Sequence, residues 1–400
     1  MKTILVSPDE RSYLTGAGDR MPLGALYLST VLTENDIDNE VIDLNHTSRN
    51  SLIDKIKSEN PDVVGLSVVS SPSFPQMESL AKEIKPYVGR IIAGGYHMSA
   101  LPNSLDGIAD SVVVGNGERG ILTALKKDGV IKEKIDPDEY PIPDRSKLNS
   151  DLYRMSLLGK RIAPMTTARG CPYACAFCGN MNKTIQFRDN DNIEEEVQGL
   201  KEDGFEAVYF YNESHTINRK RAIDVGKIMK RHDMKYRLET RANHIDNEMA
   251  EMLSDTGCML VALGIESGDD KVLEAINKKA TVNQSREAVQ ALGHHGIPTK
   301  GYFIMGLPEQ DVNSALKTIE FAKELRGYGL AMADFYTLTP FPGSPIHNNP
   351  KKFGVRILSK DYSKYIEAGN GQVEPVIETK WLSSMGIKSL VNRAKIEWKN

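Results

Sequence analysis

Short apolar runs alternate with helical stretches in two successive series along this 400-residue chain, and few folds accommodate both series. The first series predicts a parallel sheet with helices such as Gly24–Glu34 and Phe74–Ile84 on its two faces. Its expected strands are Thr3–Val6, Glu40–Asp43, Val63–Ser67, Arg90–Ala93 and Ser111–Val114. Residues 1–130 are therefore predicted to form a flavodoxin-like or Rossmann-like α/β domain, whose ligands bind beyond the carboxyl ends of the strands.

Several prolines, of which Pro137 is the first, interrupt this rhythm, so residues 131–160 are predicted to be a linker. The second series has six strand–helix pairs, which predict a partial (β/α)6 barrel over residues 161–345 with its functional loops at the carboxyl ends of the strands. The expected strands are Pro164–Ala168, Ala207–Tyr211, Tyr236–Thr240, Met259–Ile265, Thr299–Met305 and Asp334–Leu338. Residues 346–400 are less regular and are predicted to be a small C-terminal extension for substrate binding or a lid.

Three of the four cysteines, Cys171, Cys175 and Cys178, lie in one short loop after the first strand of this barrel. A C-x3-C-x2-C run suits three corners of a 4Fe–4S cube and leaves the fourth iron open to a small molecule. Clusters that only carry electrons usually take four cysteines. The alternatives are scattered core cysteines or a zinc site completed by Cys258 or a histidine, although zinc loops usually show paired C-x2-C spacings. The spacing therefore indicates a cluster that takes part in chemistry.

The composition excludes several classes of protein. A formal net charge of −4 does not suit a large nucleic-acid interface. No apolar run approaches the length of a membrane span, and Met1–Val6 is too short for a signal peptide. With three of four cysteines in one loop, no disulfide framework is expected, and the predicted location is a reducing cytoplasm. An oxygen-sensitive cluster would also favour an anaerobic setting.

The segment from Thr167 to Gly179 resembles the radical S-adenosylmethionine (SAM) superfamily, with Phe177 as the usual aromatic residue before the last cysteine. The resemblance implies a 4Fe–4S cluster whose open iron binds the amino and carboxylate groups of SAM. It also implies that reduction of the cluster cleaves SAM to methionine and a 5′-deoxyadenosyl radical.

Later segments resemble the same superfamily and imply further contacts with SAM. Glu213 would accept a hydrogen bond from the SAM ammonium, although capping of its strand is an alternative, and nearby His215 has no assigned role. Glu239 and Arg241 alternate on one strand and would face a ribose hydroxyl and a carboxylate, unless they form a mutual salt bridge. Lys278 is expected on a solvated helix face. The SAM-binding residues so implied are Phe177, Glu213, Glu239, Arg241, Gly264, Glu266 and Ser267.

A flavodoxin-like module ahead of a radical barrel resembles the cobalamin-dependent (class B) radical SAM methyltransferase family. The matching stretches include Pro22–Leu28, Asp62–Ser67, Gly94–His97 and Gly115–Glu118. The Asp-x-His-x-x-Gly signature is absent, so base-off cobalamin without a histidine on cobalt is expected, with the loop from Val69 at its lower face. A cofactor-free domain is the alternative. The implied cobalamin-binding residues are Leu23, Gly24, Ser67, Val69, Ser70, Ser71, Gly94, Gly95, Tyr96, His97, Gly115, Gly117 and Glu118.

The resemblance implies methylation of an unactivated sp3 carbon through methylcobalamin and a 5′-deoxyadenosyl radical. A reduced ferredoxin-like or flavodoxin-like protein would supply electrons, and a peptide or protein residue is the expected substrate, with methyl-coenzyme M reductase as one target to consider. Two alternatives remain, namely ring contraction or cyclisation without methyl donation, and a cobalamin and iron–sulfur sensor. A methylthiotransferase is disfavoured because its front domain needs three more cysteines.

Overall fold

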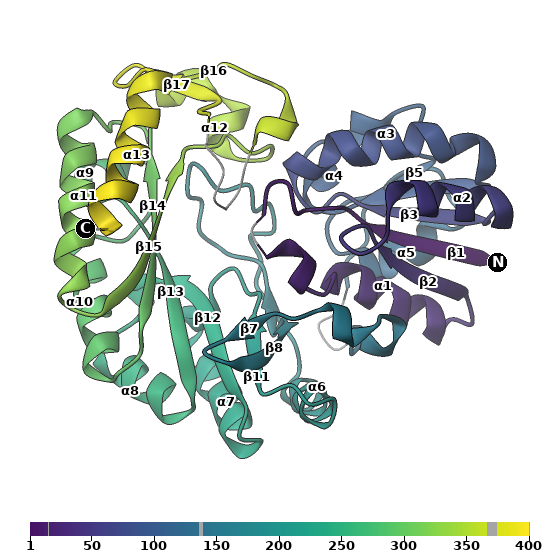
Figure 1. Cartoon of the computed structure of the whole chain (residues 1–400), viewed down its shortest axis with the longest axis horizontal. Helices are drawn as coiled ribbons and strands as arrows, with labels where there is room; N and C mark the ends of the chain where they lie inside the picture. Colours follow the sequence, from purple (N-terminus) through teal and green to yellow (C-terminus); the bar gives the residue numbers. More distant parts are fainter. Residues whose placement is uncertain (15, 136–138, 366–373, 400) are drawn as a thin grey trace. The chain divides into compact units, whose positions relative to one another are not determined.

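The computed structural model describes residues 1–14, 16–135, 139–365 and 374–399. Among them the chain divides into two compact units, Met1–Met155 with Asp361–Gly371 and Ser156–Lys360 with Gln372–Asn400. Each unit is built on its own sheet, fully parallel in the first unit and largely parallel in the second (Figure 1). None of the described helices combines the length and the apolar composition that crossing a bilayer requires.

The first unit contains a six-stranded sheet in the order β2-β1-β3-β4-β5-β6, in which every neighbouring pair runs parallel. The strands are β1 (Lys2–Ser7), β2 (Asp38–Asp43), β3 (Val63–Ser67), β4 (Arg90–Gly94), β5 (Ser111–Val113) and β6 (Gly129–Ile131). The strand order reverses between β1 and β3, which makes the carboxyl ends of these strands the expected place for a ligand. The flavodoxin-like prediction is confirmed, and β6 is an additional strand.

Helices cover both faces of this sheet (Figure 1). They are α1 (Leu23–Glu34), α2 (Arg49–Glu59), α3 (Phe74–Ile84), α4 (Tyr96–Ala100) and α5 (Gly117–Ala124). The helices α2, α3 and α4 share one apolar core with the sheet, whereas α1 and α5 pack together on the opposite face. In α3 the residues Met77, Leu80 and Ile84 recur at helical spacing and are fully buried, so the period of the sequence matches the face that packs.

A segment from near the end of the chain, Asp361–Tyr365, belongs to the first unit. The Tyr362 ring meets the His97 ring edge-on with centroids 4.8 Å apart, and it meets the Phe74 ring in the same way at 6.0 Å. Tyr365 is buried and packs on Tyr362. The first unit is therefore assembled from two stretches of sequence that are far apart.

Much of the stretch predicted to be a linker packs on the first unit. Ile135, Tyr140 and Tyr153 are buried, and the Tyr153 hydroxyl donates to Asp43 Oδ2 at 3.1 Å. Pro137, the first of the prolines that suggested a linker, lies outside the described residues. The two compact units meet in sequence between Met155 and Ser156.

The second unit contains a seven-stranded sheet in the order β15-β14-β13-β12-β11-β8-β7. The strands are β7 (Ser156–Leu157), β8 (Lys160–Met165), β11 (Ala207–Phe210), β12 (Lys235–Arg241), β13 (Cys258–Glu266), β14 (Thr299–Met305) and β15 (Leu330–Thr337). Six of them, β8 and β11 to β15, are neighbours in chain order and run parallel, whereas β7 is antiparallel to β8. This curled sheet confirms the prediction of a partial barrel.

Helices follow the strands of the barrel and cover its outer face (Figure 1). They are α6 (Asn190–Glu202), α7 (Arg219–Arg231), α8 (Asn247–Asp255), α9 (Asp270–Ala275), α10 (Val282–His294) and α11 (Val312–Arg326). A polar side chain immediately before each of them accepts a backbone N–H of the first helical turn, which fixes where the helix begins. These caps are Asp189, Asn218, Asp246, Asp269, Thr281 and Asp311.

The C-terminal part of the second unit is more regular than the sequence suggested. It contains α12 (Pro345–Asn348), an antiparallel pair of strands, β16 (Val355–Ile357) and β17 (Ile377–Thr379), and α13 (Ser384–Lys399). The helix α13 packs on the edge strand β15 and on α11 through Ile387, Leu390, Val391 and Ala394. The sequence pattern did not predict this helix.

Candidate active site

The cysteine loop begins and ends at a short antiparallel ladder beyond the carboxyl end of β8. The ladder pairs β9 (Ala168–Arg169) with β10 (Gln186–Phe187). Within the loop the Cys171 N–H donates to Asn182 O at 3.0 Å, which folds the loop back on itself. The loop therefore lies where a barrel of this kind places its reactive groups.

The three cysteines of this loop differ in exposure, since Cys175 is buried whereas Cys171 and Cys178 are half-buried. Burial raises the pKa of the Cys178 thiol, and the neighbouring charges of Cys175 and Cys171 raise it further. A bound iron would counter this effect, because a positive ion stabilises the thiolate. Cys258 begins β13, at the opposite end of the strands, so the structure does not bring it to the loop as the zinc alternative requires.

No group of three or more His, Cys, Asp and Glu side chains among the described residues is arranged around a single metal ion. The cysteine loop is compatible with a cubane nonetheless, because its three thiolates would bind three different irons and need not converge on one point. Thiolates are the donors that iron–sulfur clusters take, so the chemistry of the donor set fits the cluster.

Polar side chains after β11 fasten the cysteine loop to the barrel. Glu213 accepts the Gly170 N–H at 3.0 Å, immediately before the first cysteine. Asn212 accepts the Thr167 N–H at 2.9 Å and donates to His215 Nδ1 at 2.8 Å. These hydrogen bonds give Glu213 a structural task whether or not it also contacts SAM.

His215, which had no assigned role in the sequence, is a buried structural residue. Its ring stacks on Phe210 with centroids 4.5 Å apart, and burial lowers its pKa to about 3. The imidazole is therefore neutral at physiological pH and serves as a hydrogen-bonding partner of Asn212.

Arg241 ends β12 and joins that strand to the cysteine loop. Its Nη1 donates to Cys175 Sγ at 3.3 Å, and its guanidinium carbon lies 3.8 Å from the centroid of the Tyr173 ring. The Nη2 atom is buried and has no hydrogen-bond partner in the described part of the chain. A buried cationic donor without a partner suits a ligand carboxylate, so this atom fits the predicted contact with SAM.

Glu239 has partners other than Arg241. It accepts the hydroxyl of Tyr209 and, at 2.8 Å, that of Tyr302, and Arg237 Nη2 lies 3.8 Å from the same carboxylate oxygen. These residues line the inner face of the barrel on β11, β12 and β14. The mutual salt bridge considered for Glu239 and Arg241 is not what the structure shows, and a ribose would have to share Glu239 with two phenols.

Glu266 forms a buried ion pair with Lys278, whose Nζ lies 2.7 Å from Glu266 Oε1. Gly264 makes room for this pair, because a Cβ there would lie 2.6 Å from Glu266 Oε1 and 2.8 Å from Lys278 Nζ. Lys278 is 4% exposed, so its prediction as a solvated residue is wrong. Ser267 is fully buried and its hydroxyl lies 3.1 Å from Thr318 Oγ1.

The residues predicted to bind cobalamin all lie at or beyond the carboxyl ends of β1, β3, β4 and β5. Leu23 and Gly24 begin α1; Ser67 ends β3, followed by Val69, Ser70 and Ser71; Gly94 ends β4, followed by Gly95, Tyr96 and His97; and Gly115, Gly117 and Glu118 follow β5. The fold therefore brings four separate sequence stretches to one edge of the sheet.

Bare backbone dominates this edge. Gly95 has φ +104°, and a Cβ there would lie 2.4 Å from Val68 O, so only glycine allows β3 and β4 to end so close together. Ser70 Oγ is buried and has no hydrogen-bond partner in the described ranges. A hydroxyl of this kind beside a tight backbone turn fits a polar ligand.

His97 is turned into the first unit. It is 1% exposed, its Nδ1 lies 3.0 Å from Ser71 Oγ, and its ring stacks on Phe74 with centroids 4.4 Å apart. Tyr96, by contrast, is exposed. The histidine therefore holds the loop after β3 in place and does not project from the edge of the sheet.

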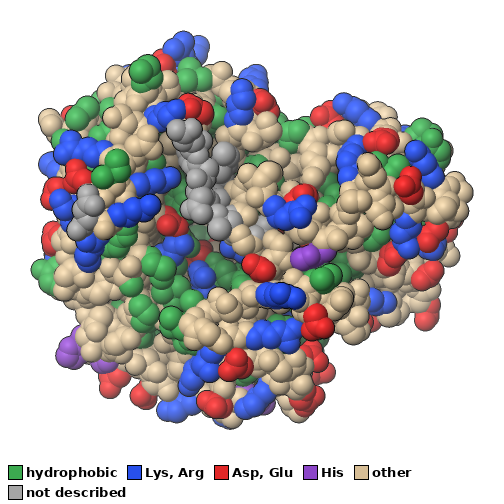
Figure 2. Space-filling view, in the orientation of Figure 1, with side chains coloured by type: hydrophobic (Ala, Val, Ile, Leu, Met, Phe, Trp, Pro, Cys, Tyr) green, Lys and Arg blue, Asp and Glu red, His purple; other side chains and the backbone are tan. Residues whose placement is uncertain are grey.

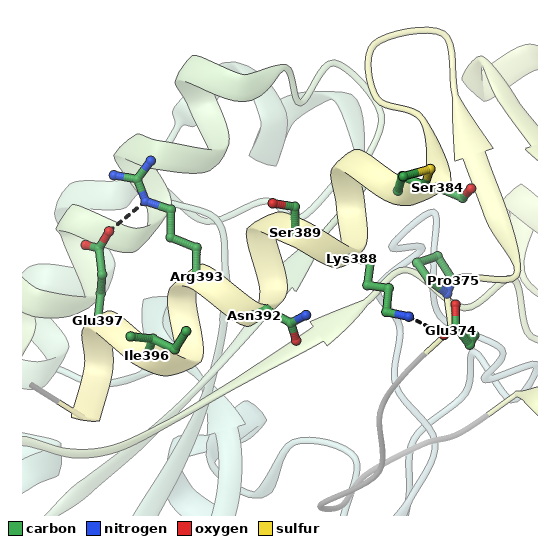
Figure 3. A pocket seen from close by; sticks show the side chains of 10 residues that line it. Glu374, Pro375, Ser384, Lys388, Ser389, Asn392, Arg393, Ile396 and Glu397 are labelled. Carbon is green, nitrogen blue, oxygen red and sulfur yellow. Dashed lines mark hydrogen bonds and ion pairs between the residues drawn. The ribbon is translucent and has the colours of Figure 1, made fainter.

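Two surface features lie apart from these residues. A groove of about 700 Å³ runs along α13 (Figure 3), and Glu374, Lys388, Arg393 and Glu397 are among the residues that line it. None of the predicted site residues lines this groove. On the face in Figure 2, basic and acidic side chains are interspersed.

Sequence reasoning missed Tyr173, Asn212 and His244 as parts of the site. The Tyr173 hydroxyl lies 2.7 Å from His244 Nε2, although the two residues are 71 positions apart. Asn212 and His244 do follow predicted strands, and this position at the carboxyl end of a barrel strand is the one signal that could have identified them.

Comparison with known proteins supplies the family relationships. The radical SAM superfamily matches residues 165–322, and the B12-binding domain matches residues 14–125. An uncharacterized methyltransferase from Pyrococcus horikoshii is 28% identical over all of this chain and 92% of that protein. The anaerobic magnesium-protoporphyrin IX monomethyl ester cyclase of Rubrivivax gelatinosus is 25% identical over 80% of this chain and 63% of that protein.

The solved structure of the radical SAM methyltransferase TsrM from Kitasatospora setae, with cobalamin and a 4Fe–4S cluster bound, superposes with a TM-score of 0.74. It is 17% identical and the match covers 92% of this chain and 82% of that one. At this level of identity the likeness shows a common fold for the two chains.

Proposed function

Because the chain belongs to the cobalamin-dependent radical SAM methyltransferase family, we propose that it is an enzyme that methylates an unactivated sp3 carbon. Its two domains imply three cofactors, a 4Fe–4S cluster, SAM and cobalamin. The observation that carries the proposal is a three-cysteine loop beside Arg241 Nη2, which is buried and has no hydrogen-bond partner among the described residues, in a chain that also contains a B12-binding domain.

The cofactors, when bound, supply the radical that removes a hydrogen atom from the substrate and the methyl group that replaces it. The protein holds and orients them. Cys171, Cys175 and Cys178 would ligate three irons, Arg241 would receive the SAM carboxylate, and Glu213 keeps the loop in register with the barrel. A reduced ferredoxin-like or flavodoxin-like protein in an anaerobic cytoplasm is the electron donor in this proposal.

Cobalamin would bind base-off, with no histidine on cobalt. The packing of His97 against Ser71 and Phe74 supports this mode, because a ring that is 1% exposed and stacked on Phe74 is not presented to a ligand at the sheet edge. Ser70 and Ser71, at the loop after β3, are the residues we assign to the lower face of the corrin.

We propose a polar substrate, namely a residue of a peptide or protein. The inner face of the barrel carries charged and phenolic groups, and Lys300 pairs with Asp334 there at 2.7 Å with both side chains partly exposed. A lipid would remove these charged groups from water, and desolvation of an ion pair costs free energy. Peptides from methyl-coenzyme M reductase are one target to assay.

The decisive experiment is anaerobic turnover of candidate peptides with SAM that carries a deuterated methyl group. We expect a peptide that gains the labelled methyl group, together with S-adenosylhomocysteine in proportion to product, both measured by mass spectrometry. Formation of 5′-deoxyadenosine and methionine without any S-adenosylhomocysteine would contradict methyl transfer.

That contrary result would instead support a second candidate, an oxidative cyclisation in which cobalamin donates no methyl group. The match to a cyclase over 80% of this chain favours keeping this candidate. The same assay separates the two reactions, since a cyclase product loses hydrogen and incorporates no deuterated methyl group.

A further inference from the structure

Arg241 occupies a position from which one guanidinium can serve two partners. It is 6% exposed and lies at the carboxyl end of β12. Its Nε donates to Asn243 Oδ1 at 3.3 Å and its Nη1 donates to Cys175 Sγ at 3.3 Å, whereas its buried Nη2 has no hydrogen-bond partner within the described ranges. One nitrogen therefore already contacts a predicted cluster ligand while another remains for SAM.

The guanidinium is held by a residue of the cysteine loop itself. Its carbon lies 3.8 Å from the centroid of the Tyr173 ring, a cation–π geometry, and Tyr173 lies between Cys171 and Cys175 in sequence. The Tyr173 hydroxyl lies 2.7 Å from His244 Nε2, and His244 Nδ1 lies 3.3 Å from Ser214 Oγ. This chain of contacts ties the cysteine loop to the ends of β11 and β12.

We propose that Arg241 raises the reduction potential of the cluster through its hydrogen bond to Cys175, and that Tyr173 and His244 are positioning residues that hold the guanidinium there. Reduction moves one electron from the external donor into the cluster, with no bond formed or broken. The added negative charge is stabilised by a cation that donates to a ligand sulfur, and hydrogen bonds to sulfur are an established control of cluster potential. This inference rests on the proposed function, because it requires a cluster on the three cysteines.

The chain offers a matched control in Arg237, which lies four residues before Arg241 on the same face of β12. Its guanidinium carbon is 3.8 Å from the centroid of the Tyr209 ring, the same stacking distance as in the Arg241–Tyr173 pair. In the described part of the chain it donates to none of the three loop cysteines, and its Nη2 lies 3.8 Å from Glu239 Oε1. Replacing it therefore removes a stacked guanidinium from the barrel without touching a cluster ligand.

The test is a redox titration of the full chain, reconstituted anaerobically with iron and sulfide, with the reduced cluster followed by electron paramagnetic resonance. Arg241→Lys and Tyr173→Leu should both shift the midpoint potential to a more negative value, whereas Arg237→Lys should leave it at the wild-type value. Tyr173→Phe keeps the ring and loses only the hydroxyl, so a smaller shift in the same direction is expected. Iron content of each variant is measured alongside, and Tyr173→Phe serves as the decisive variant if Arg241→Lys loses iron.

Unchanged potentials in Arg241→Lys and Tyr173→Phe, at full iron content, would overturn this inference alone. Equal shifts in Arg241→Lys and Arg237→Lys would overturn it too, because the effect would then reflect barrel charge in general. Failure of the wild-type chain to bind a cluster or to cleave SAM would instead overturn the proposed function, so the two failures are distinguishable.

Discussion

The two predicted cofactor sites both lie at the carboxyl ends of parallel strands, yet they are built from different kinds of residue. At the edge of the barrel, charged side chains are buried against specific partners, as in the pairs Lys278–Glu266 and Arg241–Cys175. At the edge of the first unit, the candidate residues are mostly glycines and serines, and Gly95 is packed against the backbone of Val68. The barrel site depends on side chains that are present, whereas the site of the first unit depends on space that glycines leave open.

This difference predicts opposite sensitivities. Removal of a side chain should damage the barrel site, whereas addition of a methyl group should damage the edge of the first unit. Four experiments, taken from the largest expected effect to the smallest, test this contrast.

The first experiment removes a predicted cluster ligand. Cys175→Ala should abolish binding of essentially all iron after anaerobic reconstitution, because a cube cannot be held on the remaining loop thiolates. Cobalamin binding should be unchanged, since the B12-binding match lies in the other unit. Cys258→Ala is the control, because its thiol is buried at the start of β13 and donates to Leu260 O at 3.6 Å. Wild-type iron content in Cys175→Ala would show that this thiol is not a ligand.

The second experiment leaves one buried charge without its partner. Lys278→Met should destabilise the second unit by about 3–5 kcal/mol, because Glu266 is then uncompensated in the interior. Both tryptophans, Trp381 and Trp398, lie in that unit, so their fluorescence during urea denaturation reports its unfolding. The double variant Lys278→Met with Glu266→Gln should recover most of the loss. A single variant as stable as the wild type would show that the pair contributes little.

The third experiment adds a methyl group where the first unit has no room. Gly95→Ala should weaken cobalamin binding about tenfold, equivalent to about 1.4 kcal/mol, because its Cβ would lie 2.4 Å from Val68 O. Gly107→Ala is the matched control, since Gly107 also has a positive φ, +76°, but has nothing within 4 Å of the added atom. Affinity is read from the absorbance of bound cobalamin. Equal weakening in both variants would attribute the effect to backbone strain and not to the lost space.

The fourth experiment uses pH. Above about pH 6.5 the His215 imidazole is neutral in both the folded and the unfolded chain. Below that value the imidazole is protonated in the unfolded chain. In the folded chain it stays neutral down to about pH 3, because burial lowers the pKa of His215. Stability should therefore fall as pH falls through this window, by up to about 1.4 kcal/mol per pH unit from this residue.

His215→Gln removes this titration and keeps a hydrogen-bonding side chain beside Asn212. We expect the variant to show a shallower loss of stability between pH 6.5 and 4 than the wild type, measured by urea denaturation with tryptophan fluorescence. Parallel curves for the two proteins would show that His215 carries no part of the pH dependence.

Local pattern was sufficient to predict the elements that position both sites. The range Thr299–Met305 was predicted for β14 and Phe74–Ile84 for α3, and the structure has these same bounds. In both cases the burial follows the period of the sequence, every second residue in β14 and every third or fourth in α3. The strand β6 was not predicted, because it is three residues long and two of them are exposed, so its sequence shows no alternation of apolar and polar residues.

Partnerships between distant residues could not be predicted in this way. Lys278 was expected on a solvated helix face, yet it follows the end of α9 and forms a buried ion pair with Glu266 on the preceding strand. Arg241 was assigned to a carboxylate, and nothing local to it indicates that Tyr173 and Cys175 occupy its other surfaces. The residue types of the site could therefore be predicted from the sequence. The hydrogen-bond and ion-pair partner of each side-chain atom could be identified only from the structure.

The return of Asp361–Tyr365 to the first unit bears on how this chain is synthesised and handled. The barrel is synthesised before Tyr362. Phe74 and His97, the neighbours of the Tyr362 ring, therefore remain without this contact until the barrel has been translated. An expression fragment that stops at Met155 would lack the same cover. Biochemists who want the front module by itself should therefore graft this short stretch back onto it through an artificial connection.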